Sequence, residues 1–342
     1  MKNKVLFFSI DRLGDYFIRS NVIFNITKYY KTSEIICSNL NSKLINKQSF
    51  FDKIYVFDTS KKNINKIKYI INFFYKKYDS VICFDGKNIS NILVFLIRAN
   101  FKYIFIYKKY GFLNNLKTKL YCSLLNFLNI KYEILYNRKI IENVIIDHYP
   151  NKFKSLKKYY NNINDETYYL SNFELDKDIN FNNRYILIHL DEKFEDIKNI
   201  NLEFSNALNV LAKNSNKIII LTSFKNNHKY YKNLSIKKIV FKNLDQINSI
   251  KEKIYSLEDV PLKEFNFLIN KSDLNISCHG GFFVHSSLYN KKMTIDLINF
   301  SQKKWLSAWV TPCDNYKIMY KSDLTKKFDI RDIIKKLSDE IK

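Results

Sequence analysis

The chain contains little glycine and proline, with 5 Gly and 3 Pro in 342 residues. This scarcity excludes collagen-like chains and flexible low-complexity linkers, which depend on both residue types. Intrinsic disorder is excluded as well, because 46% of the residues are hydrophobic and 16% are aromatic, whereas disordered chains are poor in both. The length corresponds to about two domains of ordinary size. We therefore expect a folded protein of two domains.

Cysteines are few and do not form pairs in the sequence. The five cysteines lie far apart, and no Cys-x-x-Cys occurs. The sequence thus indicates neither a zinc site nor a thioredoxin-like redox site. Cys37 and Cys83 lie in apolar, strand-like runs, so we expect them to be small core residues in a reducing compartment.

No apolar segment is long enough to cross a bilayer, which takes about 20 mostly apolar residues. The most apolar stretch, 89–107, is interrupted by Arg98, Asn100 and Lys102. The first residues, Met-Lys-Asn-Lys-Val-Leu-Phe-Phe-Ser, lack the longer apolar region and the cleavage site of a signal peptide. We expect a cytoplasmic protein. Peripheral docking on the inner-membrane face is a further option that the sequence leaves open.

Acidic residues are outnumbered by basic ones, since 57 Lys and Arg against 33 Asp and Glu give a net charge of +24. This charge favours polyanionic partners such as nucleic acid, anionic lipid head groups or phosphorylated glycans. AT-rich codons would produce the same excess of Lys, Asn, Ile, Tyr and Phe, so both explanations stay open. The lysines occur in short pairs along the chain rather than in one polybasic arm. Without a known nucleic-acid-binding motif, a nucleic-acid-binding protein is only an alternative, and no specific nucleic acid is expected as a partner.

Short β-rich runs alternate with longer helical patterns along the chain. The expected strands of the first half are 5–8, 34–37, 53–57, 80–84 and 103–106, and those of the second half are 185–190, 217–221, 238–241, 273–277 and 293–298. The segment 112–164 has a mostly helical pattern, and 329–342 closes the chain as an amphipathic helix. Strands separated by long helices predict parallel sheets. We expect an α/β protein of two doubly wound domains, 1–178 and 179–342, with ligands beyond the carboxyl ends of the strands in a cleft between them.

Two of the five glycines are adjacent, Gly280-Gly281, between an expected strand and a helix. Paired glycines in such a chain mark a positive φ or a close approach to the backbone. Free N–H groups at the start of the following helix, near Phe282, would suit a phosphate. His279 and His285 flank the turn and are candidates for donating hydrogen bonds to a diphosphate. A tight turn without a ligand is the alternative.

A second candidate site follows the first expected strand, at Asp11-Arg12-Leu13-Gly14-Asp15. Asp15 has two interpretations. It is either a carboxylate stabilised by the dipole of the helix that it opens, or a general base that faces the cleft. In the second interpretation, Arg12 would hold an anionic group nearby.

Several of these segments resemble one family. Gly14-Asp15 at the head of a helix, the run Tyr78–Gly86, the strand Tyr185–Leu190, and Ser272–Ser277 followed by Gly280-Gly281 are similar to the heptosyltransferase-like glycosyltransferases of family 9. The resemblance implies a GT-B fold, which is two Rossmann-like domains that face a cleft. It also implies an inverting sugar transfer from a nucleotide-diphosphate donor, with no metal and no other cofactor.

The resemblance also implies roles for individual residues. Asp15 matches the general base that deprotonates the acceptor hydroxyl. The donor-binding residues would be Lys193, Thr222, Ser223, His279, Gly280, Gly281, Phe282 and His285, and those on the acceptor or phosphate side Arg12, Gly14 and His189. Lys193 is preferred over Lys198 as the residue that neutralises charge on the leaving group, and Thr222 and Ser223 would face the ribose or the base.

The chain departs from the family at the donor loop. The family usually has Asp-Thr-Gly-x-x-His, whereas this chain has His279-Gly-Gly-Phe-Phe-Val-His285, without the acid and with one extra residue. ADP-heptose is therefore one possible donor among several. The expected function is transfer of heptose or a similar sugar to a lipid-linked or phosphorylated acceptor of a bacterial surface glycan, such as lipopolysaccharide core or O-antigen, beside an anionic membrane. A GT-B transferase of another family, with a different nucleotide donor, is the alternative.

Overall fold

The computed structural model describes residues 2–11, 13–46, 50–57, 73, 75–85, 87–107, 112–135, 184–223, 229–289, 291–302 and 314–341. The chain divides into two compact units, Met1–Asn172 and Phe173–Lys342. The boundary that the sequence predicts, between 178 and 179, lies outside the described residues. The same is true of the end of the helical pattern predicted for 112–164.

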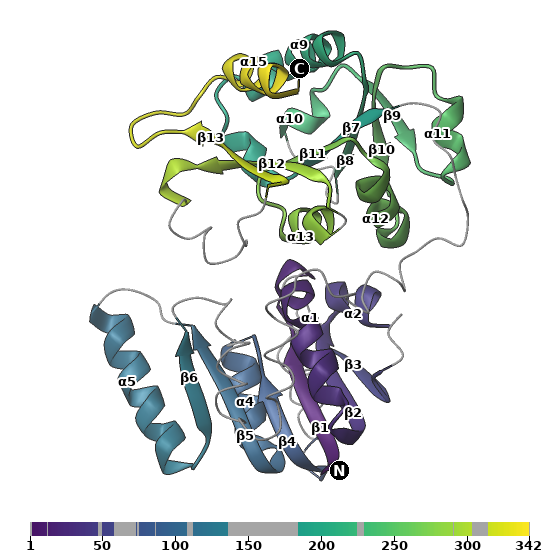
Figure 1. The fold of residues 1–342 in the computed structure, drawn as a ribbon. Coiled ribbons are helices and arrows are strands. Elements are labelled where there is room, and N and C mark those ends of the chain that lie inside the picture. Colours follow the sequence, from purple (N-terminus) through teal and green to yellow (C-terminus); the bar gives the residue numbers. More distant parts are fainter. Residues whose placement is uncertain are drawn as a thin grey trace. The chain divides into compact units, whose positions relative to one another are not determined.

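The N-terminal unit is built on a six-stranded parallel sheet of order β3-β2-β1-β4-β5-β6 (Figure 1). Its strands are β1 (Lys2–Ser9), β2 (Tyr30–Ser38), β3 (Lys53–Phe57), β4 (Lys77–Cys83), β5 (Arg98–Tyr107) and β6 (Lys131–Leu135), and its helices are α1 (Leu13–Thr27), α2 (Asn39–Ile45), α4 (Asn88–Leu96) and α5 (Phe112–Phe127). This is the doubly wound order, and it reverses between β1 and β4.

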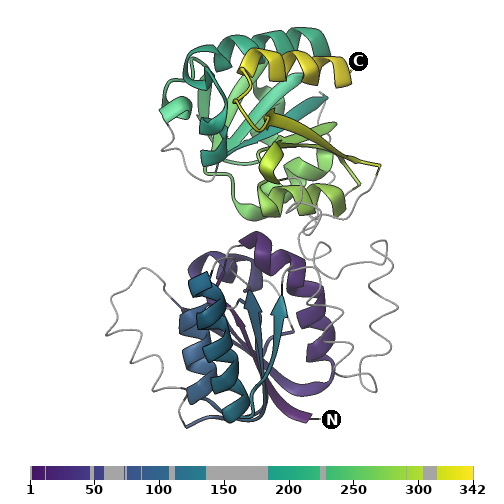
Figure 2. The same ribbon diagram turned by 90° about the vertical axis from the view of Figure 1, so that its left-hand side faces the viewer.

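The central strands of this unit form because their apolar runs are covered on both faces. Every residue of the run Val5–Phe8 is fully buried, and helices lie on both sides of the sheet (Figure 2). Leu6 and Phe8 share one core cluster with Leu93 of α4 and Leu125 of α5. The prediction that Cys37 and Cys83 are core residues is confirmed, since both are fully buried, and neither forms a disulfide.

The C-terminal unit contains a seven-stranded parallel sheet of order β13-β12-β11-β7-β8-β10-β9. Its strands are β7 (Tyr185–Leu190), β8 (Ile218–Ser223), β9 (Lys237–Val240), β10 (Ile254–Glu258), β11 (Leu274–Ser277), β12 (Met293–Asn299) and β13 (Tyr316–Ser322). Its helices are α9 (Ile200–Ser215), α10 (Lys229–Lys232), α11 (Asp245–Ser249), α12 (Leu262–Lys271), α13 (Gly281–Tyr289) and α15 (Ile330–Ile341), with short 3-10 helices η2 (Glu192–Asp196) and η3 (Phe300–Gln302).

The closing helix α15 packs against α9 within this unit (Figure 1). Ile330, Ile333, Ile334 and Leu337 are its buried residues, and they join the core cluster beneath β7 and β8. The predicted amphipathic pattern of this helix is thereby confirmed. Its apolar side completes the hydrophobic core of the C-terminal unit.

The mostly helical prediction for 112–164 is wrong at β6, which the sequence analysis did not identify. Helix α5 ends because Asn129 takes a left-handed φ of 51°, and the Ile130 N–H donates to the Leu125 carbonyl at 2.9 Å. This is the hydrogen-bond pattern of a Schellman cap, which stops a helix. The chain then turns into a five-residue strand that pairs with β5.

Three other features differ from the sequence prediction. Strands β10 and β13 were not predicted, and the strand expected at 103–106 begins earlier, at Arg98, directly after α4. Lys77 pairs with Arg98 and Tyr78 with Ala99 across β4 and β5. Pairing with β4 therefore extends β5 backwards to Arg98.

Candidate functional site

The carboxyl ends of β7 and β11 lie side by side at the point where the strand order of the C-terminal sheet reverses. Ser277, the last residue of β11, pairs with His189 of β7 on one side and with Asp296 of β12 on the other. In open parallel sheets, ligands bind at this point. The predicted turn His279-Gly280-Gly281 begins just beyond it, and α13 starts at Gly281.

His279 is the residue of this turn that is held most tightly. It is buried and takes a left-handed φ of 57°. Asp296, fully buried on β12, accepts hydrogen bonds at 2.6 Å from both the backbone N–H and the ring Nδ1 of His279. The hydroxyl of Tyr316, on β13, donates to the same carboxylate at 2.7 Å. A non-glycine residue persists in this conformation only where its surroundings impose it, and such residues cluster at functional sites.

Lys193 lies beside the same turn. Its Nζ donates to the carbonyl of His279 at 2.8 Å, and its side chain is 29% exposed. The position of Lys193 is set by η2, whose N-terminal cap Asp191 accepts the backbone N–H of Lys193 at 2.9 Å. Lys198 instead pairs through its backbone with Asp329. The structure therefore brings Lys193, and not Lys198, together with the turn.

The charges around η2 are coupled. Burial raises the pKa of the Asp191 carboxyl, and the ammonium of Lys193 partly offsets this effect. The side chain of Lys321 is 1% exposed, and its Nζ contacts the Lys193 carbonyl and lies 3.4 Å from Asp196 Oδ2. Although burial alone would raise the pKa of Asp196, Lys321 and the neighbouring donors hold it below its usual range. A buried cation thus supports the loop that carries Lys193.

Gly280 does not have a positive φ. A Cβ on Gly280 would lie 3.5 Å from His189 Cδ2 and 3.6 Å from Phe283 Cβ, both ordinary van der Waals distances. The left-handed residue of the turn is His279 instead. The protein's own packing therefore does not require glycine at position 280. The remaining reason for a glycine there is that a group from outside this packing approaches the backbone closely.

The neighbours of Gly280 in α13 have different surroundings. Gly281 is half-buried, and the Gly280 carbonyl accepts the N–H of Val284 at 2.9 Å as the helix begins. Phe282 is buried, with its ring stacked on Phe265 at 6.2 Å, so it contributes to packing. His285 belongs to α13, but its side chain lies outside the described residues.

His189 is 4% exposed, with its ring 4.9 Å from that of Phe265 and 5.4 Å from that of Phe283. Its Nδ1 lies 3.1 Å from Oγ1 of Thr222. Burial lowers the pKa of His189 to about 3, so the ring is neutral at physiological pH. Thr222 and Ser223 end β8 and are also buried. This environment favours a packing role for His189 over the phosphate contact that the sequence predicts.

The neutral, buried His189 predicts a pH-dependent stability. Because its folded pKa of about 3 lies below 6.5, its contribution is fully present above pH 6.5 and is lost as the pH falls toward 3. Between pH 7 and pH 5 this loss amounts to about 2 kcal/mol. Between pH 7 and pH 5, the wild type should lose about 2 kcal/mol more of its free energy of unfolding than His189→Gln does. Urea denaturation of both proteins at both pH values measures this difference. Equal losses in both proteins would contradict the assigned burial.

The other candidate residues lie in the N-terminal unit, at the carboxyl edge of its sheet. Gly14 and Asp15 are half-buried in the first turn of α1, and Arg12 lies outside the described residues. Asp85 follows β4 and accepts the N–H of Ile10 at 3.0 Å and the hydroxyl of Ser90 at 2.8 Å. The bond from Ile10 fixes the ends of β1 and β4 to each other, which positions the start of α1 at the reversal of the strand order, and the bond from Ser90 ties α4 to the same point.

Asp296, Tyr316 and Lys321 are site residues that were not predicted from the sequence. One signal was available for Asp296, since it is an acid inside the apolar run Met293–Ile298 and a buried acid needs partners. Tyr316 and Lys321 belong to β13, which was not predicted. Across the described parts of the chain, no three His, Cys, Asp or Glu side chains are grouped so that they could hold a metal ion.

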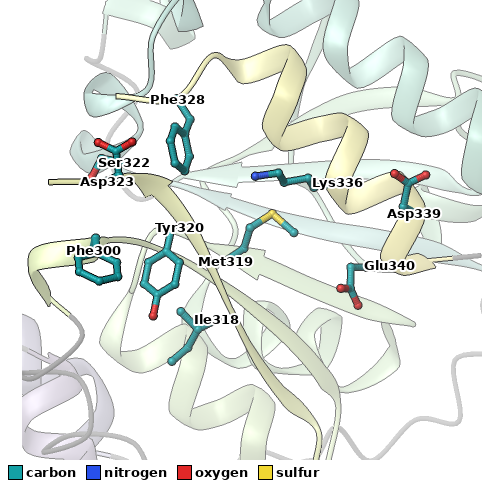
Figure 3. A pocket seen from close by; sticks show the side chains of 10 residues that line it. All are labelled: Phe300, Ile318, Met319, Tyr320, Ser322, Asp323, Phe328, Lys336, Asp339 and Glu340. Carbon is teal, nitrogen blue, oxygen red and sulfur yellow. The ribbon is translucent and has the colours of Figure 1, made fainter. Parts of the chain in front are cut away.

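An open groove elsewhere on the C-terminal unit is not part of this site. It has a volume of about 490 Å³ and lies between β13 and α15, where Tyr320, Phe328 and Lys336 line it (Figure 3). None of its lining residues belongs to the turn at 279–281 or to η2.

Comparisons with known proteins identify the fold. No family model matches the chain, and no curated protein matches its sequence. The structure of the Escherichia coli heptosyltransferase WaaC with ADP-2-deoxy-2-fluoro heptose superposes with a TM-score of 0.63 at 12% identity, covering 98% of this chain and 99% of that one. The chain has a GT-B fold.

Two further GT-B structures are similar over most of their length. A glycosyl transferase of family 9 from Veillonella parvula gives a TM-score of 0.56 at 10% identity, covering 99% of this chain and 97% of that one. The UDP-GlcNAc 2-epimerase of Methanocaldococcus jannaschii gives 0.55 at 13% identity, covering 98% and 92%. At these identities the likeness establishes the GT-B fold, which transferases and an epimerase share.

Proposed function

We propose that this GT-B protein is an inverting glycosyltransferase of the family 9 type, which uses a nucleotide-diphosphate sugar as donor. The observation that carries the proposal is the turn His279-Gly280-Gly281, clamped by Asp296 at the carboxyl edge of the sheet. Backbone N–H groups at the start of a helix, together with the helix dipole, form a binding site for phosphate groups. Structures of similar fold include the heptosyltransferase WaaC with ADP-2-deoxy-2-fluoro heptose and a UDP-GlcNAc 2-epimerase, which supports a nucleotide-sugar donor.

The donor's diphosphate would lie against Gly280 and the first N–H groups of α13. Lys193, whose ammonium is already at the turn, would neutralise the negative charge that develops on the leaving nucleoside diphosphate. We propose that protein groups alone take this role, without a metal ion or other cofactor. Thr222 and Ser223, with His285, are the further donor contacts that we propose.

The acceptor would react at Asp15. Its carboxylate takes the proton of the acceptor hydroxyl while the hydroxyl oxygen bonds to the anomeric carbon. The bond from that carbon to the diphosphate oxygen breaks on the opposite side, and its electron pair leaves with the nucleoside diphosphate. The configuration of the anomeric carbon is therefore inverted. Arg12 and Gly14 would contact the acceptor or its phosphate.

The acceptor that we propose is a lipid-linked or phosphorylated glycan of a bacterial surface, such as lipopolysaccharide core or O-antigen, and the sugar is heptose or a similar one. The named heptosyltransferases of similar fold support this class. The net charge of +24 would favour an anionic acceptor of this kind.

The test of this function is a thermal-shift panel of ADP, UDP, GDP and CDP with their sugar conjugates, plus an RNA control at two salt concentrations. A ligand at 100 times its Kd adds about 2.7 kcal/mol of stability. We expect one nucleotide class to stabilise the protein at both salt concentrations. If no nucleotide does, while RNA binds and is released by salt, the protein binds nucleic acid instead and the proposal is wrong.

A further inference from the structure

Helix α5 of the N-terminal unit carries a stripe of apolar side chains that points away from the core. The stripe consists of Leu116, Leu120, Leu124, Phe127 and Leu128, all exposed, with Leu120 at 65% and Phe127 at 85%. Their spacing of three and four residues places the first four along one side of the helix. Exposed apolar patches of this kind mark a surface that contacts a partner or a membrane.

The opposite side of α5 is already packed. Leu125 is fully buried, and Tyr121 and Cys122 lie against the core cluster of the N-terminal unit. The ring of Tyr121 meets that of Phe95 on α4 edge-to-face at 6.0 Å. The core therefore fixes the helix through these residues, and the outer stripe contributes nothing to that packing.

Positive charge borders the stripe on both sides. At 100° per residue, Lys117 and Lys119 fall on opposite flanks of the first four residues of the stripe, and both are exposed. The helix contains no Asp or Glu. An outward apolar stripe between lysines, on a helix without acids, is the pattern of helices that lie in the interface of an anionic bilayer.

We infer that the α5 stripe docks the protein on an anionic lipid surface. The apolar side chains would enter the boundary between head groups and acyl chains, and the two lysines would contact the lipid phosphates. Nothing in the described parts of the chain offers a helix with the length and apolar character to cross a bilayer. This inference rests on α5 alone and does not depend on the proposed transferase activity.

The test is flotation of the full chain with vesicles of phosphatidylcholine alone and of phosphatidylcholine with 30% phosphatidylglycerol. We expect binding to the anionic vesicles only. Lys117→Gln and Lys119→Gln should each weaken it by about fivefold, and the double variant Leu120→Ser/Phe127→Ser by at least tenfold. The matched control is Leu202→Ser/Leu324→Ser on the C-terminal unit, where both leucines are about as exposed, at 80% and 79%. This control should bind as the wild type does.

Thermal unfolding checks that each variant is folded, which the exposure of the replaced side chains leads us to expect. Two results would overturn the inference. The first is that the wild type does not float with anionic vesicles. This result is expected if another part of the chain or another protein covers the stripe. The second is that Leu120→Ser/Phe127→Ser floats like the wild type. If the same double variant converts a wild-type dimer into a monomer and leaves lipid binding intact, the stripe is instead a contact between copies.

Discussion

Replacing Asp15 with Asn will lower the rate of sugar transfer by about 10²–10⁴-fold, the contribution typical of a general base. The amide has nearly the same shape but cannot take the proton of the acceptor hydroxyl. Binding of the nucleotide should be unchanged, because the donor-binding residues that we propose belong to the other unit of the chain. The measurement is kcat with the donor that the nucleotide panel identifies, together with the nucleotide Kd by calorimetry.

Asp332→Asn is the matched control for this variant. Asp332 also lies in the first turn of a helix, α15, where it is exposed. Both substitutions remove a favourable interaction with a helix dipole, about 0.3–1 kcal/mol, but only Asp15 is assigned to catalysis. If Asp15→Asn keeps near-wild-type turnover, the carboxylate only stabilises its helix and the proposed mechanism is wrong.

Asp296→Ala will have the largest effect on the C-terminal unit. The substitution leaves three donors without their buried acceptor, namely the backbone N–H and Nδ1 of His279 and the hydroxyl of Tyr316. The expected loss in the free energy of unfolding is about 3–5 kcal/mol. Since the left-handed turn at His279 then loses its clamp, the affinity for the nucleotide should fall as well. Urea denaturation and calorimetry measure the two effects.

Tyr316→Phe separates stability from the geometry of the turn. It removes one of the three hydrogen bonds to Asp296 and leaves both bonds to His279, so we expect a loss of about 1 kcal/mol with the nucleotide affinity retained. A Tyr316→Phe protein that loses nucleotide affinity as strongly as Asp296→Ala would show that the clamp does not act through His279.

Most of the fold could be predicted from the sequence because its central strands are buried runs. Strands such as Tyr185–Leu190, buried at every position, appear as uninterrupted apolar segments. The edge strand β13, Tyr-Lys-Ile-Met-Tyr-Lys-Ser, is partly exposed and carries two lysines, so its sequence lacks that signal. Strand β6 was hidden because α5 ends at a left-handed asparagine, a conformation that the pattern of apolar residues does not encode.

The candidate site was predictable only where its residues are adjacent in the chain. Gly280-Gly281 and His279 form one short motif, and the structure places them at the reversal of strand order. The clamp was not predictable, because Asp296 is 17 residues away from His279 and reaches it only through the pairing of β11 with β12. His189 looked like a ligand contact from its place at a strand end, but the sequence does not show that Phe265 and Phe283 cover its ring.

The affinity of Gly280→Ala for the nucleotide identified by the panel tests the central claim most directly. The folded protein has room for the added methyl group, which would meet its nearest neighbours at 3.5 and 3.6 Å. The stability should therefore be unchanged or rise by about 0.4–1 kcal/mol. If the diphosphate lies against this backbone, the methyl group will block it, and the Kd will rise at least tenfold in calorimetry. An unchanged Kd in an equally stable protein would contradict the placement of the donor at this turn.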